Sequence, residues 1–190
     1  MTLPTATLAR THDVFNQSTP WADVNLFTTN QPLQDALRLH APGLGVAGLT
    51  ALGAEMGSAE MLTHARLANT HKPQLRTHDR FGHRTDVVEF HPSYHALMGA
   101  ALRHGLHATP WSRQDTGHAH VERAAGFMLF TEAEPSVLCP VSMSYAVTPA
   151  LRGNSAVWAD WSKGLASTQY DPRLAPVSYT HLRAHETSLH

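Results

Sequence analysis

The chain has 190 residues and a mass of 20.8 kDa, the length of one domain with at most a short appendage, and its 42% apolar content excludes a disordered polypeptide. Fourteen Lys and Arg residues against fifteen Asp and Glu residues give a formal net charge of −1, which excludes a nucleic-acid binder that is basic over its whole surface. The single cysteine, Cys139, excludes a disulfide framework, and a reduced cytoplasmic setting is the simplest fit. No run of 18 apolar residues occurs, so we expect no membrane partner.

Residues 1–30 show no helical or strand period, since turn-forming residues alternate with single apolar ones. We expect an extended, irregular arm that lies on the rest of the chain, because its apolar side chains must be buried against something. Those side chains are Val14, Phe15, Trp21, Val24, Leu26 and Phe27.

Apolar residues recur at helical spacing over most of the remaining chain, and proline and glycine divide this pattern into segments. The sequence predicts six or so helices, which lie within residues 31–41, 44–71 (divided at Gly57-Ser58), 92–105, 118–134, 135–149 and 156–165. Residues 72–90 are predicted to be a loop with a turn at Phe81-Gly82 and at most a short extended piece over 86–90. Residues 106–117 are predicted to be a second loop, around Pro110-Trp111. The expected fold class is therefore all-α over residues 31–176.

Residues 177–190, VSYTHLRAHETSLH, differ from the rest of the chain, because their apolar residues follow no helical or strand period and three of the fourteen residues are histidines. We interpret them as a read-through tail that is foreign to the domain, and exclude them from fold reasoning.

Two features of the composition need an explanation. Charged residues make up only 15% of the chain, against about 25% in an average protein. Low charge is typical of a domain with a face that another domain or subunit covers, and such a face exposed alone favours association. Histidine is the second feature, with 15 residues. It indicates either a metal site or a surface rich in near-neutral polar residues.

The histidine pairs do not match a known metal-binding spacing. His91 and His95 are four residues apart, His104 and His107 three, and His118 and His120 two, while the His-Glu-x-x-His pattern is absent. We therefore expect surface or capping histidines and no metal site, and a metal-binding protein remains the less favoured alternative.

Residues 136–149, SVLCPVSMSYAVTP, form an apolar helix that carries a few polar groups. We expect Cys139 to be a buried, inert thiol, although its place near a helix start leaves a nucleophilic thiol as the alternative. Ser142, Ser144 and Thr148 have two interpretations: small residues that permit close helix packing, or one wall of a ligand cavity.

Five segments, in this order along the chain, resemble the adaptive-response AidB-like branch of the acyl-CoA dehydrogenase superfamily. The resemblance spans roughly residues 11–174, and its most specific motifs are FNQ, RLAN, FHPSYH and LCPVSM. The segments are THDVFNQSTPWADVNLF, RLANTHKPQL, DVVEFHPSYHALM, FMLFTEAEPSVLCPVSMSYAVTPAL and QYDPRL.

The resemblance implies that residues 31–176 are the N-terminal helical domain of a longer flavoprotein. Members of this branch add a small β-barrel and a C-terminal helical domain, hold FAD, and form homotetramers. They are also associated with the response to DNA alkylation, bind DNA through the C-terminal part, and have weak acyl-CoA dehydrogenase activity. All of these properties are expectations that the resemblance carries.

The family's flavin-contacting Met-Thr-Glu segment would follow QYDPRL, where this chain changes to the foreign tail, and its catalytic glutamate would lie further on. No catalytic, cofactor-binding or metal residue can therefore be assigned, and whether the chain is an enzyme stays open. The resemblance places Ser142, Met143 and Tyr145 in one wall of the substrate cavity. We expect an inactive fragment that does not retain FAD; the alternative is a helical interaction or oligomerisation module without catalysis.

Overall fold

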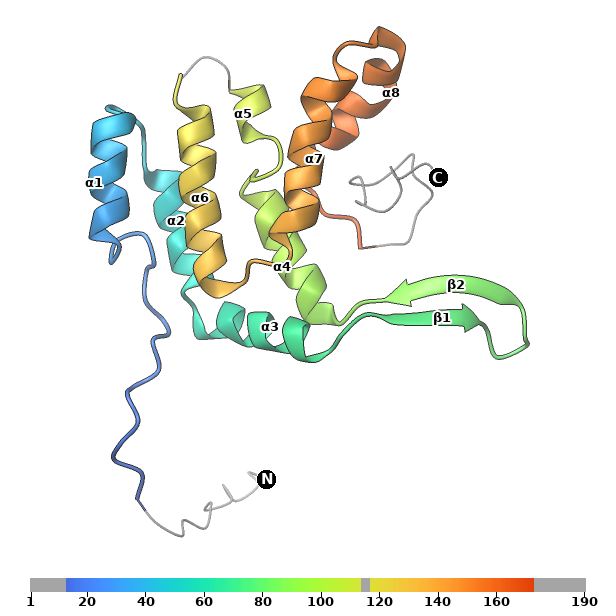
Figure 1. Ribbon diagram of the computed structural model, residues 1–190, viewed down its shortest axis with the longest axis horizontal. Helices are drawn as coiled ribbons and strands as arrows, with labels where there is room; N and C mark the ends of the chain where they lie inside the picture. Colours follow the sequence, from blue (N-terminus) through green and yellow to red (C-terminus); the bar gives the residue numbers. More distant parts are fainter. Residues whose placement is uncertain (1–12, 114–116, 173–190) are drawn as a thin grey trace, which may run out of the picture.

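The computed structural model describes residues 13–113 and 117–172, which form eight helices and one two-stranded sheet (Figure 1). This mostly helical architecture confirms the predicted fold class. The helices are α1 (Gln31–His40), α2 (Ala47–Met56), α3 (Ala59–Thr70), α4 (Pro92–Arg103), α5 (Thr109–Ser112), α6 (Ala119–Ala133), α7 (Leu138–Leu151) and α8 (Ser155–Leu165).

The helices pack mainly in pairs around one core. Helix α2 packs on α6, α3 on α4, and α7 on α8, while α3 runs across one end of the more upright helices in Figure 1. Apolar side chains at helical spacing face this core, which is the arrangement that the sequence period predicts. The most deeply buried of them are Leu52, Met56, Leu97, Leu102, Leu129, Phe130 and Val141.

The helix starts follow the sequence signals. Asn30 caps α1 by accepting a hydrogen bond from the Leu33 amide at 3.0 Å, and Ser58 caps α3 by accepting one from the Met61 amide at 3.1 Å. Each cap satisfies one of the amide donors that a helix start leaves free.

Residues 23–27 of the N-terminal arm lie along α2 as a strap. The amide of Val24 donates to the Gly57 carbonyl at 3.3 Å, and the amide of Leu26 donates to the Gly53 carbonyl at 3.0 Å. Both glycines are required by this close approach, because a Cβ on Gly53 would lie 2.6 Å from the Phe27 nitrogen. The strap thereby buries Leu26 and Phe27.

The beginning of the arm differs from the expectation. Phe15 is 95% exposed, and Val14 and Trp21 are also exposed, so the part of the chain that the structure describes does not cover them. The hydrogen bonds that hold the arm begin only at Asp23, whose carboxylate accepts the Ala59 amide at the start of α3.

The predicted loop over residues 72–90 is instead a β-hairpin that projects away from the helices (Figure 1). Strand β1 (Gln74–His78) pairs antiparallel with β2 (Arg84–Glu89), with Leu75 opposite Val88. The hairpin faces solvent on both sides, so its strands lack the alternation of apolar and polar residues that marks a half-buried strand. The Phe81-Gly82 turn is present, and Gly82 adopts a φ of 85° there.

The second predicted loop contains a short helix, α5. Pro110 occupies its first turn, a position that tolerates proline because the first amides of a helix have no partner within it. A single turn of four residues shows no apolar period, so the sequence pattern could not separate it from a loop.

Within the described residues, no helix is both long and apolar enough to cross a membrane.

We predict that Gly57→Ala destabilises the domain by about 1–3 kcal/mol, because the new Cβ would lie 1.9 Å from the Val24 carbonyl oxygen and displace the strap. Urea unfolding followed by circular dichroism measures this change. Gly45→Ala is the matched control, since nothing lies within 4 Å of its Cβ. Equal stabilities for the two variants would contradict the close approach of strap and helix.

Candidate functional site

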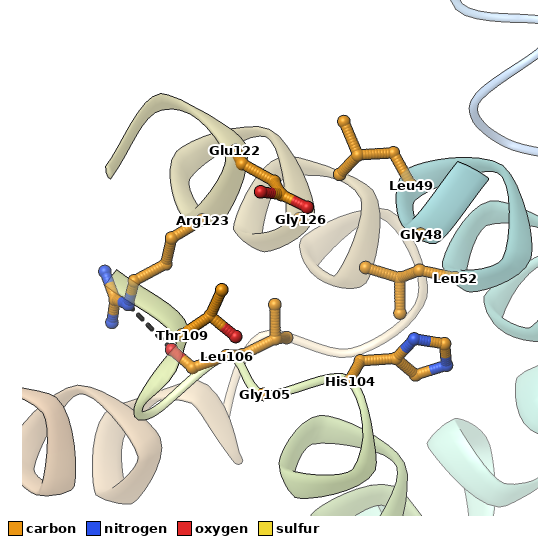
Figure 2. A pocket seen from close by; sticks show the side chains of 10 residues that line it. All are labelled: Gly48, Leu49, Leu52, His104, Gly105, Leu106, Thr109, Glu122, Arg123 and Gly126. Atoms are coloured by element: carbon orange, nitrogen blue, oxygen red, sulfur yellow. Dashed lines mark hydrogen bonds between the residues drawn. The ribbon is translucent and has the colours of Figure 1, made fainter. Parts of the chain in front are cut away.

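A small cavity lies between α2, the segment that joins α4 to α5, and α6 (Figure 2). Its walls combine leucine side chains with glycine backbone and a few polar groups. The lining residues are Gly48, Leu49, Leu52, His104, Gly105, Leu106, Thr109, Glu122, Arg123 and Gly126. Its volume is about 60 Å³, whereas pockets for drug-sized ligands span roughly 300–1,000 Å³. The cavity therefore fits a few water molecules at most.

The charged groups around this cavity are engaged with neighbouring protein groups. Arg113 Nη1 donates to Glu122 at 2.7 Å, and His104 Nε2 lies 2.8 Å from a Glu55 carboxylate oxygen. Arg123 Nε donates to the Leu106 carbonyl at 2.7 Å, the dashed line in Figure 2. These bonds hold α2, α4 and α6 together, while Arg123 Nη2 is buried without a hydrogen-bond partner in the described part of the chain.

The outer side of α7 is a second candidate, because it carries the predicted wall residues. Met143 is 38% exposed and Ser142 is half-buried, and helical spacing places both on the side that also bears Cys139. Cys139 is exposed, so the prediction of a buried thiol was wrong. The positions of α7 that face the core are Val141 and its neighbours one turn away, which leaves Cys139 on the outer side.

The other hydroxyls of α7 face inward. Ser144 and Thr148 are buried, and each donates to a carbonyl one turn earlier, Ser144 to Pro140 at 3.2 Å and Thr148 to Ser144 at 3.5 Å. Of the two interpretations of Ser144 and Thr148, the structure therefore supports close helix packing and not a cavity wall.

Tyr145, the third predicted wall residue, lies on the flank of α7 that faces α5 and α6. Its ring stacks on Trp111 with centroids 4.8 Å apart, and the Arg123 guanidinium carbon lies 3.8 Å from its ring centroid. The Tyr145 hydroxyl is 2.7 Å from His120 Nδ1, and its carbonyl accepts the Trp111 indole N–H at 2.9 Å. Tyr145 therefore fixes α7 relative to α5 and α6.

A buried carboxylate joins the helices that carry these groups. Glu134, between α6 and α7, is 1% exposed and accepts hydrogen bonds from the amides of Ser136 and Val137, each at 3.0 Å. The Ser136 hydroxyl and Asn69 of α3 also donate to it, Asn69 at 3.1 Å. Burial opposes the charged form, but these donors outweigh it and hold the pKa of Glu134 below its ordinary value of 4.5.

The sequence pattern does not single out this carboxylate. One sequence signal could have identified it: Glu134 directly precedes Pro135-Ser136 at a helix start. A side-chain oxygen at such a position can accept hydrogen bonds from the first free amides of the next helix. The link to Asn69, 65 residues away, has no sequence signal.

In the His91/His95 and His104/His107 pairs, each histidine contacts a different protein group. In the part of the chain that the structure describes, no three His, Cys, Asp or Glu side chains lie close enough to hold a metal ion. His91 accepts the Ser93 amide at the start of α4, and His95 Nδ1 lies 2.7 Å from the Tyr170 hydroxyl. His107 is buried, with Nε2 at 2.9 Å from the Ser167 carbonyl oxygen.

Comparison with known proteins gives consistent matches over this region. A family model described as the adaptive response protein AidB N-terminal domain matches residues 16–172. AidB of Escherichia coli (strain K12), whose name places it with the acyl-CoA dehydrogenases, is 38% identical over 168 residues. That match covers 88% of this chain but 31% of the E. coli protein.

Two solved structures share the fold. The apo form of Bd2924 superposes with a TM-score of 0.73 at 24% identity, over 82% of this chain and 32% of its own. Caenorhabditis elegans ACDH-11, solved in complex with C11-CoA, superposes with a TM-score of 0.68 at 19% identity, over 88% of this chain and 30% of its own. The chain thus spans about a third of the length of each of these relatives.

We predict that Glu134→Gln lowers the free energy of unfolding at neutral pH by about 2 kcal/mol, because hydrogen bonds to a buried charge are lost. The folded-state pKa of Glu134 is depressed, so its contribution is complete above the ordinary value of 4.5 and is lost as the pH falls through the folded-state pKa. The stability difference between wild type and variant should therefore shrink in acid.

Urea unfolding at several pH values between neutral and strongly acidic measures this difference. Glu60→Gln is the matched control, because the Glu60 side chain is 84% exposed and should change stability by less than about 0.5 kcal/mol. A difference between wild type and Glu134→Gln that stays constant down to acid pH would show that the charge of Glu134 has no stabilising role.

Proposed function

Because the chain belongs to the AidB family, as its N-terminal domain, we propose that it supplies one wall of the acyl-CoA site of a longer, FAD-dependent dehydrogenase. The observation that carries the proposal is the outer side of α7, where Met143 is exposed and Ser142 half-buried, while the opposite side of the helix is buried in the core. A wall of this kind needs an apolar surface with a few hydroxyls, which these two side chains provide.

Tyr145 completes the proposed wall as its rigid edge. Its contacts with Trp111 and Arg123 hold the α7 backbone in place, so the exposed side chains of the helix have a fixed position. Positioning of this kind matters for a cavity whose other walls come from different domains.

The described residues by themselves do not fit FAD. The cavity between α2 and α6 has a volume of about 60 Å³, and the α7 face is open on its outer side. FAD would supply the hydride-accepting chemistry in the longer protein. The role of this domain is to exclude water from one side of the acyl-CoA site and to hold the acyl group there. We accordingly propose that the 190-residue chain alone neither retains FAD nor oxidises acyl-CoA.

The matching family is described as an adaptive response protein. We propose, more narrowly, that the longer protein acts in the response to DNA alkylation. Binding of DNA and assembly into a tetramer are assigned to the longer protein, together with its β-barrel and C-terminal helical domains. A reduced, cytoplasmic setting agrees with this role and with the free thiol of Cys139.

The test compares the chain with the product of a reading frame that continues beyond Pro176 through a Met-Thr-Glu segment. We expect the purified 190-residue chain to be colourless, and the longer product to carry flavin that is bleached by a branched acyl-CoA. In the longer product, Met143→Ala should change the preference for acyl chain length, whereas Leu39→Ala, an exposed position on α1, should not. A longer product without flavin would overturn the proposal and favour an interaction module without catalysis.

A further inference from the structure

Two histidines stand where the β-hairpin joins the helices. His71 is the residue at which α3 ends and His91 is the residue that precedes α4, so the pair brackets the whole hairpin. Their imidazole rings are stacked, with centroids 4.6 Å apart and an angle of 12° between the ring planes. We call His71 and His91 the hairpin root.

His91 also caps α4. Its Nδ1 accepts a hydrogen bond from the Ser93 amide at 3.1 Å, which satisfies one of the amides that a helix start leaves free. Only a nitrogen without a proton can accept, so this bond requires an unprotonated Nδ1. A protonated ring would instead bring an N–H donor and a positive charge to the positive end of the α4 dipole.

The stack of the hairpin root favours the same protonation state. Two neutral imidazoles can lie face to face, whereas two imidazolium rings at 4.6 Å would place like charges against each other. Histidine side chains change charge within about pH 5–8. Both contacts of His91 therefore hold at the upper end of this range and weaken as the pH falls through it.

Other ionisable groups surround the hairpin root. His64 Nδ1 lies 3.0 Å from the Ser93 hydroxyl oxygen, so a proton on His64 acts on the same end of α4. The carboxylates are paired elsewhere within the described residues, Glu60 with His64 at 3.9 Å and Glu89 with Arg76 at 2.9 Å. The groups are His64 and Glu60 of α3, Lys72 directly after His71, Glu89 of β2, and His95 of α4, whose ring is edge-on to Phe90.

The rest of the hairpin has little else to fix its direction. Its strands project away from the helices, and Leu75 in β1 is 60% exposed (Figure 1). Phe90 stacks on Tyr94 with ring centroids 4.3 Å apart, which adds a second contact beside the hairpin root. Neither of these two rings changes charge between about pH 5 and 8, so their stack serves as a pivot that acid leaves intact.

We propose that the hairpin root is a pH-sensitive hinge, which fixes the direction of the hairpin while His71 and His91 are neutral and loosens it once they are protonated. Acid then changes the directions that the ribbon samples without unfolding it, because its hydrogen bonds join β1 to β2. The inference concerns the 190-residue chain itself and is independent of the acyl-CoA site proposed above.

Amide hydrogen exchange of the 190-residue chain at about pH 7.5 and about pH 5.5 tests the cap, once each rate is divided by the intrinsic rate at that pH. The protection of the Ser93 amide should fall about fivefold in acid, the equivalent of a lost helix cap. In His91→Asn, a cap that does not titrate should keep the protection equal at both pH values. His40→Asn, at an exposed position of α1, is the matched control and should respond as the wild type does.

Time-resolved fluorescence anisotropy tests the movement. In a Cys139→Ser background, a dye on Phe81→Cys in the hairpin turn should show a larger amplitude of local motion in acid, and a dye on Leu39→Cys of α1 should not. The two positions are matched, at 73% and 74% exposure. His71→Phe keeps a ring on His91 but removes one charge, so the increase should be smaller than in the wild type.

Two results would overturn the hinge. One is equal Ser93 protection, or equal motion of the dye in the hairpin, at both pH values in the wild-type background. The other is a pH response that persists in His91→Asn, which would assign the response to His64.

Discussion

The buried carboxylate of Glu134 is the constraint on which the arrangement of the later helices depends. It accepts the free amides before α7 and the side-chain amide of Asn69, so α3, α6 and α7 meet at one fixed corner. A charge at this position is stable only while its donors are in place, because an unpaired buried carboxylate costs several kcal/mol. One set of hydrogen bonds therefore ties the turn between α6 and α7 to α3.

The faces that α6 and α7 turn outward explain the composition of the chain. Side chains such as Met128 and Met143 stay exposed while the inner faces of the same helices are among the most buried parts of the core. A domain that is completed by further protein needs fewer surface charges, and we propose this as the reason for the 15% of charged residues. The match spans only about a third of the length of each relative, which agrees with this proposal.

Local signals predicted the helices and left the long-range contacts undetermined. Proline, glycine and capping residues such as Asn30 and Ser58 mark helix ends, since they act on neighbouring backbone groups. The hairpin over residues 74–89 was missed because neither of its faces is buried. Cys139 was misplaced because an apolar stretch does not reveal which of its sides faces the core. The cluster of Trp111, Arg123 and Tyr145 joins three elements, and only the fold brings them together.

The rate at which the single thiol reacts tests most directly whether the outer side of α7 belongs to a shared site. Cys139 lies one turn before Met143 on that side and is the only cysteine among the 190 residues. In the 190-residue chain, a small thiol reagent should alkylate Cys139 as fast as it alkylates a free thiol in solution. In the longer protein loaded with acyl-CoA it should be slowed many-fold. Equal rates in the two proteins would show that nothing covers this face, and would contradict its role as a cavity wall.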